Sequence, residues 1–75
     1  MPTVARLGNI LIRLYAEEHV PPHFHVVTPD GEVMVRIADL QVHAGSIDRK
    51  SLRVAIEWAM QNIDLLNAEW RRLND

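Results

Sequence analysis

The chain of 75 residues contains no cysteine. This absence excludes disulfide bonds and thiolate-ligated metal sites, so stability must come from packing or from a partner. Long apolar stretches are also missing, since no run approaches the roughly 20 residues of a membrane-spanning helix. The first ten residues, MPTVARLGNI, lack the apolar core of a signal peptide. We therefore expect a cytoplasmic protein that makes no membrane contact.

Clustered basic residues are absent as well. Eight lysine and arginine residues stand against ten aspartate and glutamate residues, which gives a formal net charge of −2. Arg49–Lys50 and Arg71–Arg72 are isolated pairs, whereas non-specific phosphate binding depends on clustered cations. This charge pattern argues against a protein that coats DNA. It does not exclude a specific contact with RNA.

The length is that of a single domain spanning residues 1–75. A chain this small buries only about 60% of its unfolded surface, and its core supplies only roughly 3–5 kcal/mol. Burial against a partner, either a second protein or another copy in a homodimer, would add stability. We expect no cofactor.

The N-terminal half alternates apolar and polar residues with the period of a β-strand. Gly8–Asn9 and Pro29–Glu32 have the composition of turns, and Gly31 would supply the left-handed position of the second turn. A short edge strand could follow at Leu40–Val42, before a loop at His43–Asp48. The main predicted strands are Val4–Leu7, Ile10–Tyr15, His23–Thr28 and Val33–Ala38. We expect a three- or four-stranded antiparallel sheet.

The period changes to 3.6 residues in the C-terminal third. Asp48 or Ser46 could cap the helix that begins there. Asn62 could end a first helix in the left-handed conformation, so this region is either one kinked helix or two. Its apolar stripe comprises Leu52, Ala55, Ile56, Ala59, Ile63, Leu66, Trp70 and Leu73. Strands followed by helix predict an α+β fold in which the helical region covers one face of the sheet.

Strand alternation assigns the side chains to two faces of the sheet. Phe24 would join the aliphatic layer beneath the helical region, while His23 and His25 would point together toward solvent. The face opposite the helical region would gather Arg13, Tyr15, His23, His25 and Arg36.

Two adjacent prolines precede the histidine strand. Pro21 and Pro22 fix φ twice and stiffen the loop 16–22, and either X–Pro bond could be cis. A simple stop at the entry to the strand is an equally good interpretation.

One chemistry that fits the face opposite the helical region is acid–base catalysis. His23 and His25 would act as the acid and base pair. Arg13 and Arg36 would hold a phosphate as forked donors, and Tyr15 would position a base. This set of residues is that of a small metal-independent ribonuclease.

A second possibility is a metal site. His19, His23 and His25, with Glu18 close in sequence, could ligate a transition ion such as Zn²⁺. The simpler interpretation is a group of exposed histidines beside a proline loop. Glu17 and Glu18 are then either loop surface or the carboxylates that orient a histidine.

A third possibility is a surface for a partner. Another chain could bind the face opposite the helical region or an unpaired edge at Val4–Leu7 or Leu40–Val42. Trp58 lies off the main apolar stripe and in line with Val54. Trp58 is therefore either part of the core or part of an interface, where tryptophan is enriched.

Two long segments carry a family resemblance, MPTVARLGNILIRLYAEEHVPPHFHV and RKSLRVAIEWAMQNIDLLNAEW. They closely resemble a family of short bacterial proteins catalogued only as a domain of unknown function, the 4160 family. The most specific element is the block Tyr15–Val26, with its tyrosine, acidic loop and Pro-Pro-His-Phe-His-Val run. Trp70 also matches, and Val20 stands where many members have asparagine.

The resemblance implies no settled activity, but it does imply a partner. Members are often encoded beside another small protein, and such pairs look like toxin–antitoxin modules. We therefore expect one component of such a two-protein module, with the small protein from the neighbouring gene as its partner. Whether the chain is an enzyme stays open. The alternatives are a metal-independent ribonuclease-like toxin, a pure protein-binding module and a histidine-based metal-binding regulator.

Overall fold

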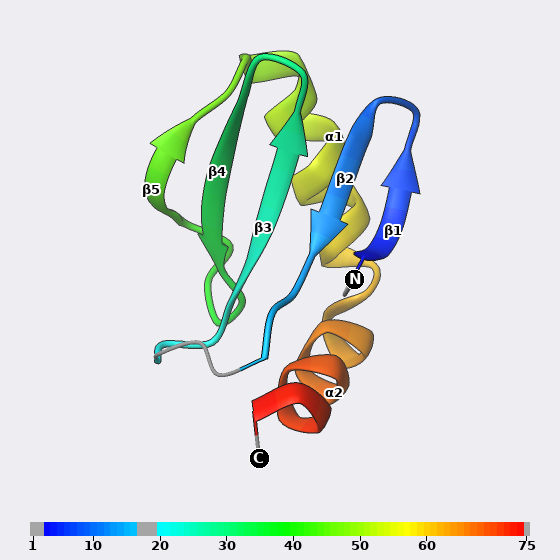
Figure 1. The fold of residues 1–75 in the computed structure, drawn as a ribbon, viewed down its shortest axis with the longest axis vertical. Helices are drawn as coiled ribbons and strands as arrows, with labels where there is room; N and C mark the ends of the chain where they lie inside the picture. The colour runs from blue at the N-terminus through cyan, green and yellow to red at the C-terminus, as the bar shows by residue number, and fades with distance from the viewer. Residues whose placement is uncertain (1–2, 17–19, 75) are drawn as a thin grey trace.

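The computed structural model describes residues 3–16 and 20–74. In these residues five antiparallel strands are followed by two helices, which confirms the α+β class (Figure 1). The strands are β1 (Thr3–Leu7), β2 (Ile10–Arg13), β3 (His23–Thr28), β4 (Gly31–Arg36) and β5 (Val42–Ser46). The helices are α1 (Arg49–Met60) and α2 (Ile63–Asn74). Each strand pairs with its neighbour in the chain, so the sheet is a meander in the order β1-β2-β3-β4-β5.

The expectation of three or four strands is wrong, because the described residues form five. Strand β5 begins at the last residue of the edge strand expected at Leu40–Val42, and it occupies most of the predicted loop at His43–Asp48. Its pairing is irregular, since Met34 lies opposite Ala44 whereas Val35 lies opposite Val42. His43 is thus a bulge residue within a strand. A bulge interrupts the two-residue period on which strand prediction depends.

Two-residue turns close the first and third hairpins. Gly8 has a φ of 65° between the paired residues Leu7 and Ile10, as the Gly-Asn pair predicts. Thr28 pairs with Gly31, so the second of these turns consists of Pro29 and Asp30 alone. The prediction that Gly31 supplies a left-handed position is wrong, because Gly31 has no positive φ and is the first residue of β4.

Local polar contacts fix the ends of the helices. Asp48 caps α1, since its Oδ2 accepts the backbone N–H of Ser51 at 2.9 Å. This hydrogen bond holds the pKa of the Asp48 carboxyl below its usual value. Asn62 lies between the helices and donates from Nδ2 to the Trp58 carbonyl at 2.8 Å. Its own carbonyl accepts the N–H of Leu66 at 2.9 Å. Asn62 does not take the left-handed conformation that the sequence predicts, and the helical region is two helices.

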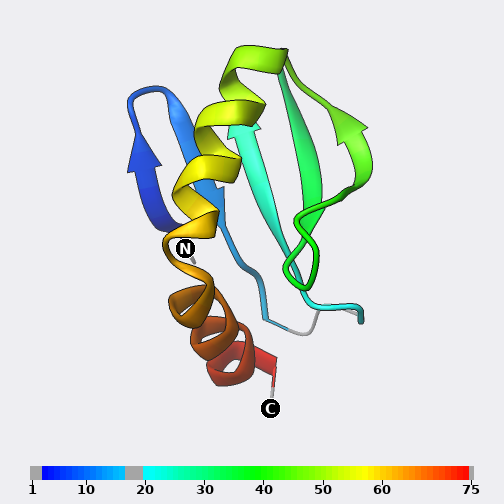
Figure 2. The same cartoon turned by 180° about the vertical axis from the view of Figure 1, so that it is seen from behind.

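The hydrophobic core lies between the sheet and the helices. Helix α1 crosses one face of the sheet, and α2 continues past the lower end of the strands (Figures 1 and 2). The buried apolar side chains are Ile10, Ile12, Leu14, Phe24, Val26, Val33, Val35, Ile37, Ala55, Ala59, Leu66 and Trp70. Within the described residues, neither helix is long and apolar enough to span a membrane.

Candidate functional site

The cross-strand register defines which residues share the face of the sheet opposite α1. Arg13 pairs with His25, His25 with Met34, and Met34 with Ala44. We call this face the open face, and in the sheet it comprises Leu11, Arg13, His23, His25, Val27, Glu32, Met34, Arg36, Ala44 and Ser46. Figures 1 and 2 show that α1 lies on the other side. The assignment of His23, His25, Arg13 and Arg36 to one face is therefore confirmed.

His25 is the centre of the polar contacts on the open face. Its Nδ1 lies 2.8 Å from Oε2 of Glu32, and the two residues are diagonal neighbours across the β3–β4 hairpin. The Tyr15 ring meets the His25 ring edge-on, with centroids 4.6 Å apart. The side chain of His25 is 11% exposed, whereas that of Glu32 is 50% exposed. A carboxylate on Nδ1 fixes the orientation and the tautomer of the imidazole, as in many acid–base sites.

His23 lies beside His25 but is covered. The two ring centroids are 5.2 Å apart. The His23 ring also lies 5.4 Å from the ring of Trp70 on α2, and His23 is only 2% exposed. Its Nδ1–H donates to the carbonyl of Pro21 at 2.8 Å. The expectation that both imidazoles point into solvent is wrong, because strand parity determines the face of a residue but not what lies over it.

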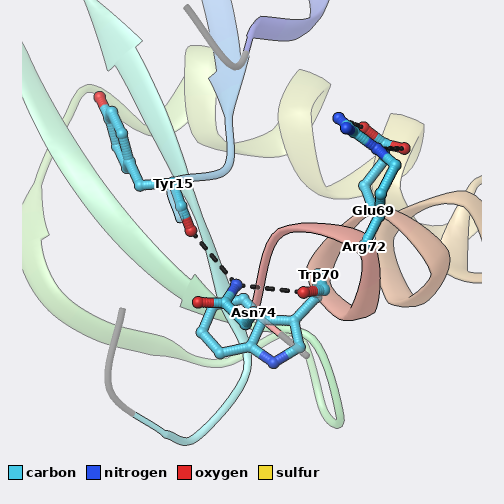
Figure 3. Close-up of polar contacts among 5 residues, drawn as sticks. All are labelled: Tyr15, Glu69, Trp70, Arg72 and Asn74. Atoms are coloured by element: carbon cyan, nitrogen blue, oxygen red, sulfur yellow. Dashed lines mark hydrogen bonds and ion pairs between the residues drawn. The ribbon is translucent and has the colours of Figure 1, made fainter. Parts of the chain in front are cut away.

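The C-terminal end of helix α2 contacts the segment that follows β2. Asn74, in the last turn of α2, donates from Nδ2 to the carbonyl of Tyr15 at 3.2 Å and to the carbonyl of Trp70 at 3.1 Å (Figure 3). On the outer side of α2, Arg72 forms a forked pair with Glu69. Tyr15 and His23 thus sit where the sheet meets α2.

The two arginines of the open face differ in their partners. The Arg36 guanidinium forms a fork with the Asp39 carboxylate, from Nε to Oδ1 at 3.0 Å and from NH2 to Oδ2 at 2.8 Å. These hydrogen bonds raise the pKa of Arg36 and lower the pKa of Asp39. The fork that was expected to hold a phosphate is therefore already occupied. Arg13 is half-buried, and its buried Nε has no acceptor in the part of the chain that the structure describes.

A shallow depression of about 290 Å³ lies on the open face. It is lined by His25, Glu32, Met34, Ala44 and Gly45. Its width follows from the small residues of β5, since Ala44 has only a methyl group and Gly45 has no side chain. The lining of the depression therefore combines the apolar side chain of Met34 with the oriented His25–Glu32 pair.

Other predicted site residues lie elsewhere. Pro21 and Pro22 are half-buried, and the Val20–Pro21 bond is cis. Glu17, Glu18 and His19 lie outside the described residues. Trp58 is half-buried and packs against the core from α1. In the described residues no three histidine, aspartate or glutamate side chains come together as a metal site.

Glu32 and Met34 could not be singled out from the sequence. Nothing in a single methionine marks a depression. Glu32 was placed in the turn because Pro29, Asp30 and Gly31 precede it. A two-residue turn instead puts Glu32 in β4, where parity with Met34 and Arg36 places it on the open face.

One family model matches residues 9–71, and its description is "Domain of unknown function (DUF4160)". The match covers the strands from β2 onward, α1 and most of α2. No curated protein and no solved structure matches the chain.

Proposed function

We propose that this chain, which belongs to the DUF4160 family, is one component of a two-protein module of toxin–antitoxin type. It binds the second protein through the open face. The observation that carries the proposal is the depression of about 290 Å³ on the face that α1 leaves uncovered. The partner is the small protein encoded by the neighbouring gene, which we call the neighbour protein.

The chemistry of the open face supports protein binding. Interfaces combine an apolar centre with a polar surround, and here the half-buried Met34 lies beside the His25–Glu32 pair. Methionine adapts its shape to a partner at low cost.

A matched pair of substitutions tests the binding face. Met34→Lys places a charge in the lining of the depression, whereas Met60→Lys places the same charge at the end of α1, where Met60 is 64% exposed. Binding of the purified neighbour protein is measured by calorimetry. We expect Met34→Lys to weaken binding at least tenfold and Met60→Lys to change it less than twofold. Equal effects, or no association of the unsubstituted proteins, would contradict the proposal.

Growth assays test the type of module. One protein of the pair is expected to arrest growth when expressed alone, and co-expression of the other should restore growth. If neither protein arrests growth, the pair is a binding module without a toxin.

The hydrogen bond between His25 and Glu32 favours a second candidate, a ribonuclease-like toxin. Glu32 would orient His25 as the general acid or base, and Arg13 on the same rung would steady a phosphate. His25→Ala should then lower RNA cleavage by the purified protein by about 10²–10⁴-fold, while His43→Ala on β5 should leave cleavage unchanged. Absence of cleavage by the unsubstituted protein would rule this candidate out.

A further inference from the structure

Strand β5 forms one edge of the sheet, and all five of its residues are exposed. One side of β5 pairs with β4. In residues 3–16 and 20–74 no further strand pairs with the other side. The backbone N–H and C=O groups along that side are therefore open to another extended chain, which is the occupant that such an edge recognises.

The sequence of β5 lacks the residues that usually protect an edge strand. VHAGS contains no lysine, aspartate, glutamate or proline. The opposite edge, β1, carries the exposed charge of Arg6, and its Val4 and Leu7 pack against the core. The bulge at His43 interrupts the start of β5, whereas Ala44–Ser46 keep a one-to-one register with β4, with Gly45 at a φ of 80°.

The depression on the open face lies directly beside this edge. Ala44 and Gly45 line its β5 side, and Met34 lies across the rung from Ala44 on β4. Neighbouring strands are about 4.8 Å apart, so a residue on a strand added beyond β5 would start about 10 Å from β4. A long side chain could pass over the Ala44 methyl group and contact Met34, whereas a short one could not.

We propose that an extended segment of the neighbour protein pairs with β5 as a sixth strand and places one long apolar or aromatic side chain in the depression. This inference rests on the proposed function and names the form that the partner takes. It joins two features in one interface, because the backbone of the segment binds the edge and its side chain fills the depression. In strand addition, the backbone hydrogen bonds to the edge provide affinity, and the side chain in the depression provides specificity.

A second copy of this chain does not meet these requirements. If two β5 strands paired with each other, the open-face residues of the incoming β5 would be Ala44 and Ser46. Neither side chain is long enough to reach Met34, so the depression would stay empty. The observations therefore favour a different chain with a larger residue at that position.

Hydrogen–deuterium exchange of the full chain with and without the neighbour protein locates the added strand. We expect amides of Val42–Ser46 to exchange at least tenfold more slowly in the complex, because new inter-strand hydrogen bonds protect them. Ala44→Glu, which blocks the path into the depression, should weaken binding at least tenfold. Ala68→Glu makes the same change at an exposed alanine of α2 and should leave binding within twofold.

The alternative outcomes separate this inference from the proposed function. If the neighbour protein binds without protecting β5, the strand-addition proposal is overturned while the proposed function stands. If β5 amides are protected in the isolated chain and its mass is that of a dimer, a second copy occupies the edge and the proposal is wrong. If the neighbour protein does not bind at all, both fail.

Discussion

Replacement of Gly45 by alanine should destabilise the protein much more than the same replacement of Gly8. Both glycines have a positive φ, 80° at Gly45 and 65° at Gly8. An L-residue in this left-handed region costs about 1–2 kcal/mol. The backbone strain is therefore similar at the two positions, and any further difference must come from the surroundings.

The surroundings differ sharply. An alanine Cβ at Gly8 would meet nothing within 4 Å. At Gly45 it would collide with the backbone carbonyl oxygen of Glu32 and lie 3.2 Å from Cα of Val33. Overpacking of this kind adds about 1–3 kcal/mol. We expect a loss of about 2–5 kcal/mol for Gly45→Ala and about 1–2 kcal/mol for Gly8→Ala. A chain of 75 residues has a total stability of about 4–11 kcal/mol.

Urea denaturation followed by far-ultraviolet circular dichroism measures both losses, with linear extrapolation of the unfolding free energy. Equal losses at the two positions would refute the register that places β5 against Glu32 and Val33. A larger loss at Gly8 would refute it as well.

Three further predictions concern the core and the helices. Val26→Ala on the core side of β3 should cost roughly 2–3 kcal/mol, and Val27→Ala on its open face clearly less, as measured by urea denaturation. Asp48→Asn retains a capping side chain but removes a carboxyl whose pKa is lowered by folding. That carboxyl stabilises the fold above about pH 4 and loses this effect as the pH falls, so the variant should lose less stability between pH 6 and pH 2.5. Asn62→Ala should cost about 1 kcal/mol through the lost bond to α1, seen as a lower melting temperature.

Much of the fold follows from patterns that one sequence carries. The alternation around Phe24 and Val26 predicted both β3 and its core face. The stripe from Leu52 to Trp70 predicted the helical region, and of the two candidate caps, Asp48 and Ser46, the structure selects Asp48. These features depend on local periodicity and on short-range capping, which do not require knowledge of distant contacts.

The remaining features depend on contacts between distant segments. The sequence pattern does not reveal β5, because the bulge residue His43 breaks the alternation of apolar and polar residues. His23 is buried because Trp70, far along the chain, lies against it. Leu40 takes a φ of 57° in the loop after β4, a conformation that leucine rarely adopts and that its sequence does not announce.

The partners within the candidate site were the hardest to predict. The sequence placed His25 and Arg13 on one face but did not show that Glu32 bonds to His25, because that contact depends on the length of one turn. The sequence also did not show that the carboxylate of Asp39 accepts a hydrogen bond from the guanidinium of Arg36. Single residues without a period or a motif carry no signal of this kind.

The most direct test of the central claim, that the open face is the working surface, is NMR mapping of the complex. Isotope-labelled protein is titrated with unlabelled neighbour protein, and the amide chemical shifts are followed residue by residue. We predict that the changes concentrate at His25, Glu32, Met34 and β5, with the exposed side of α1 around Val54 unchanged. Changes concentrated on α1 and α2 with the open face unaffected would contradict it.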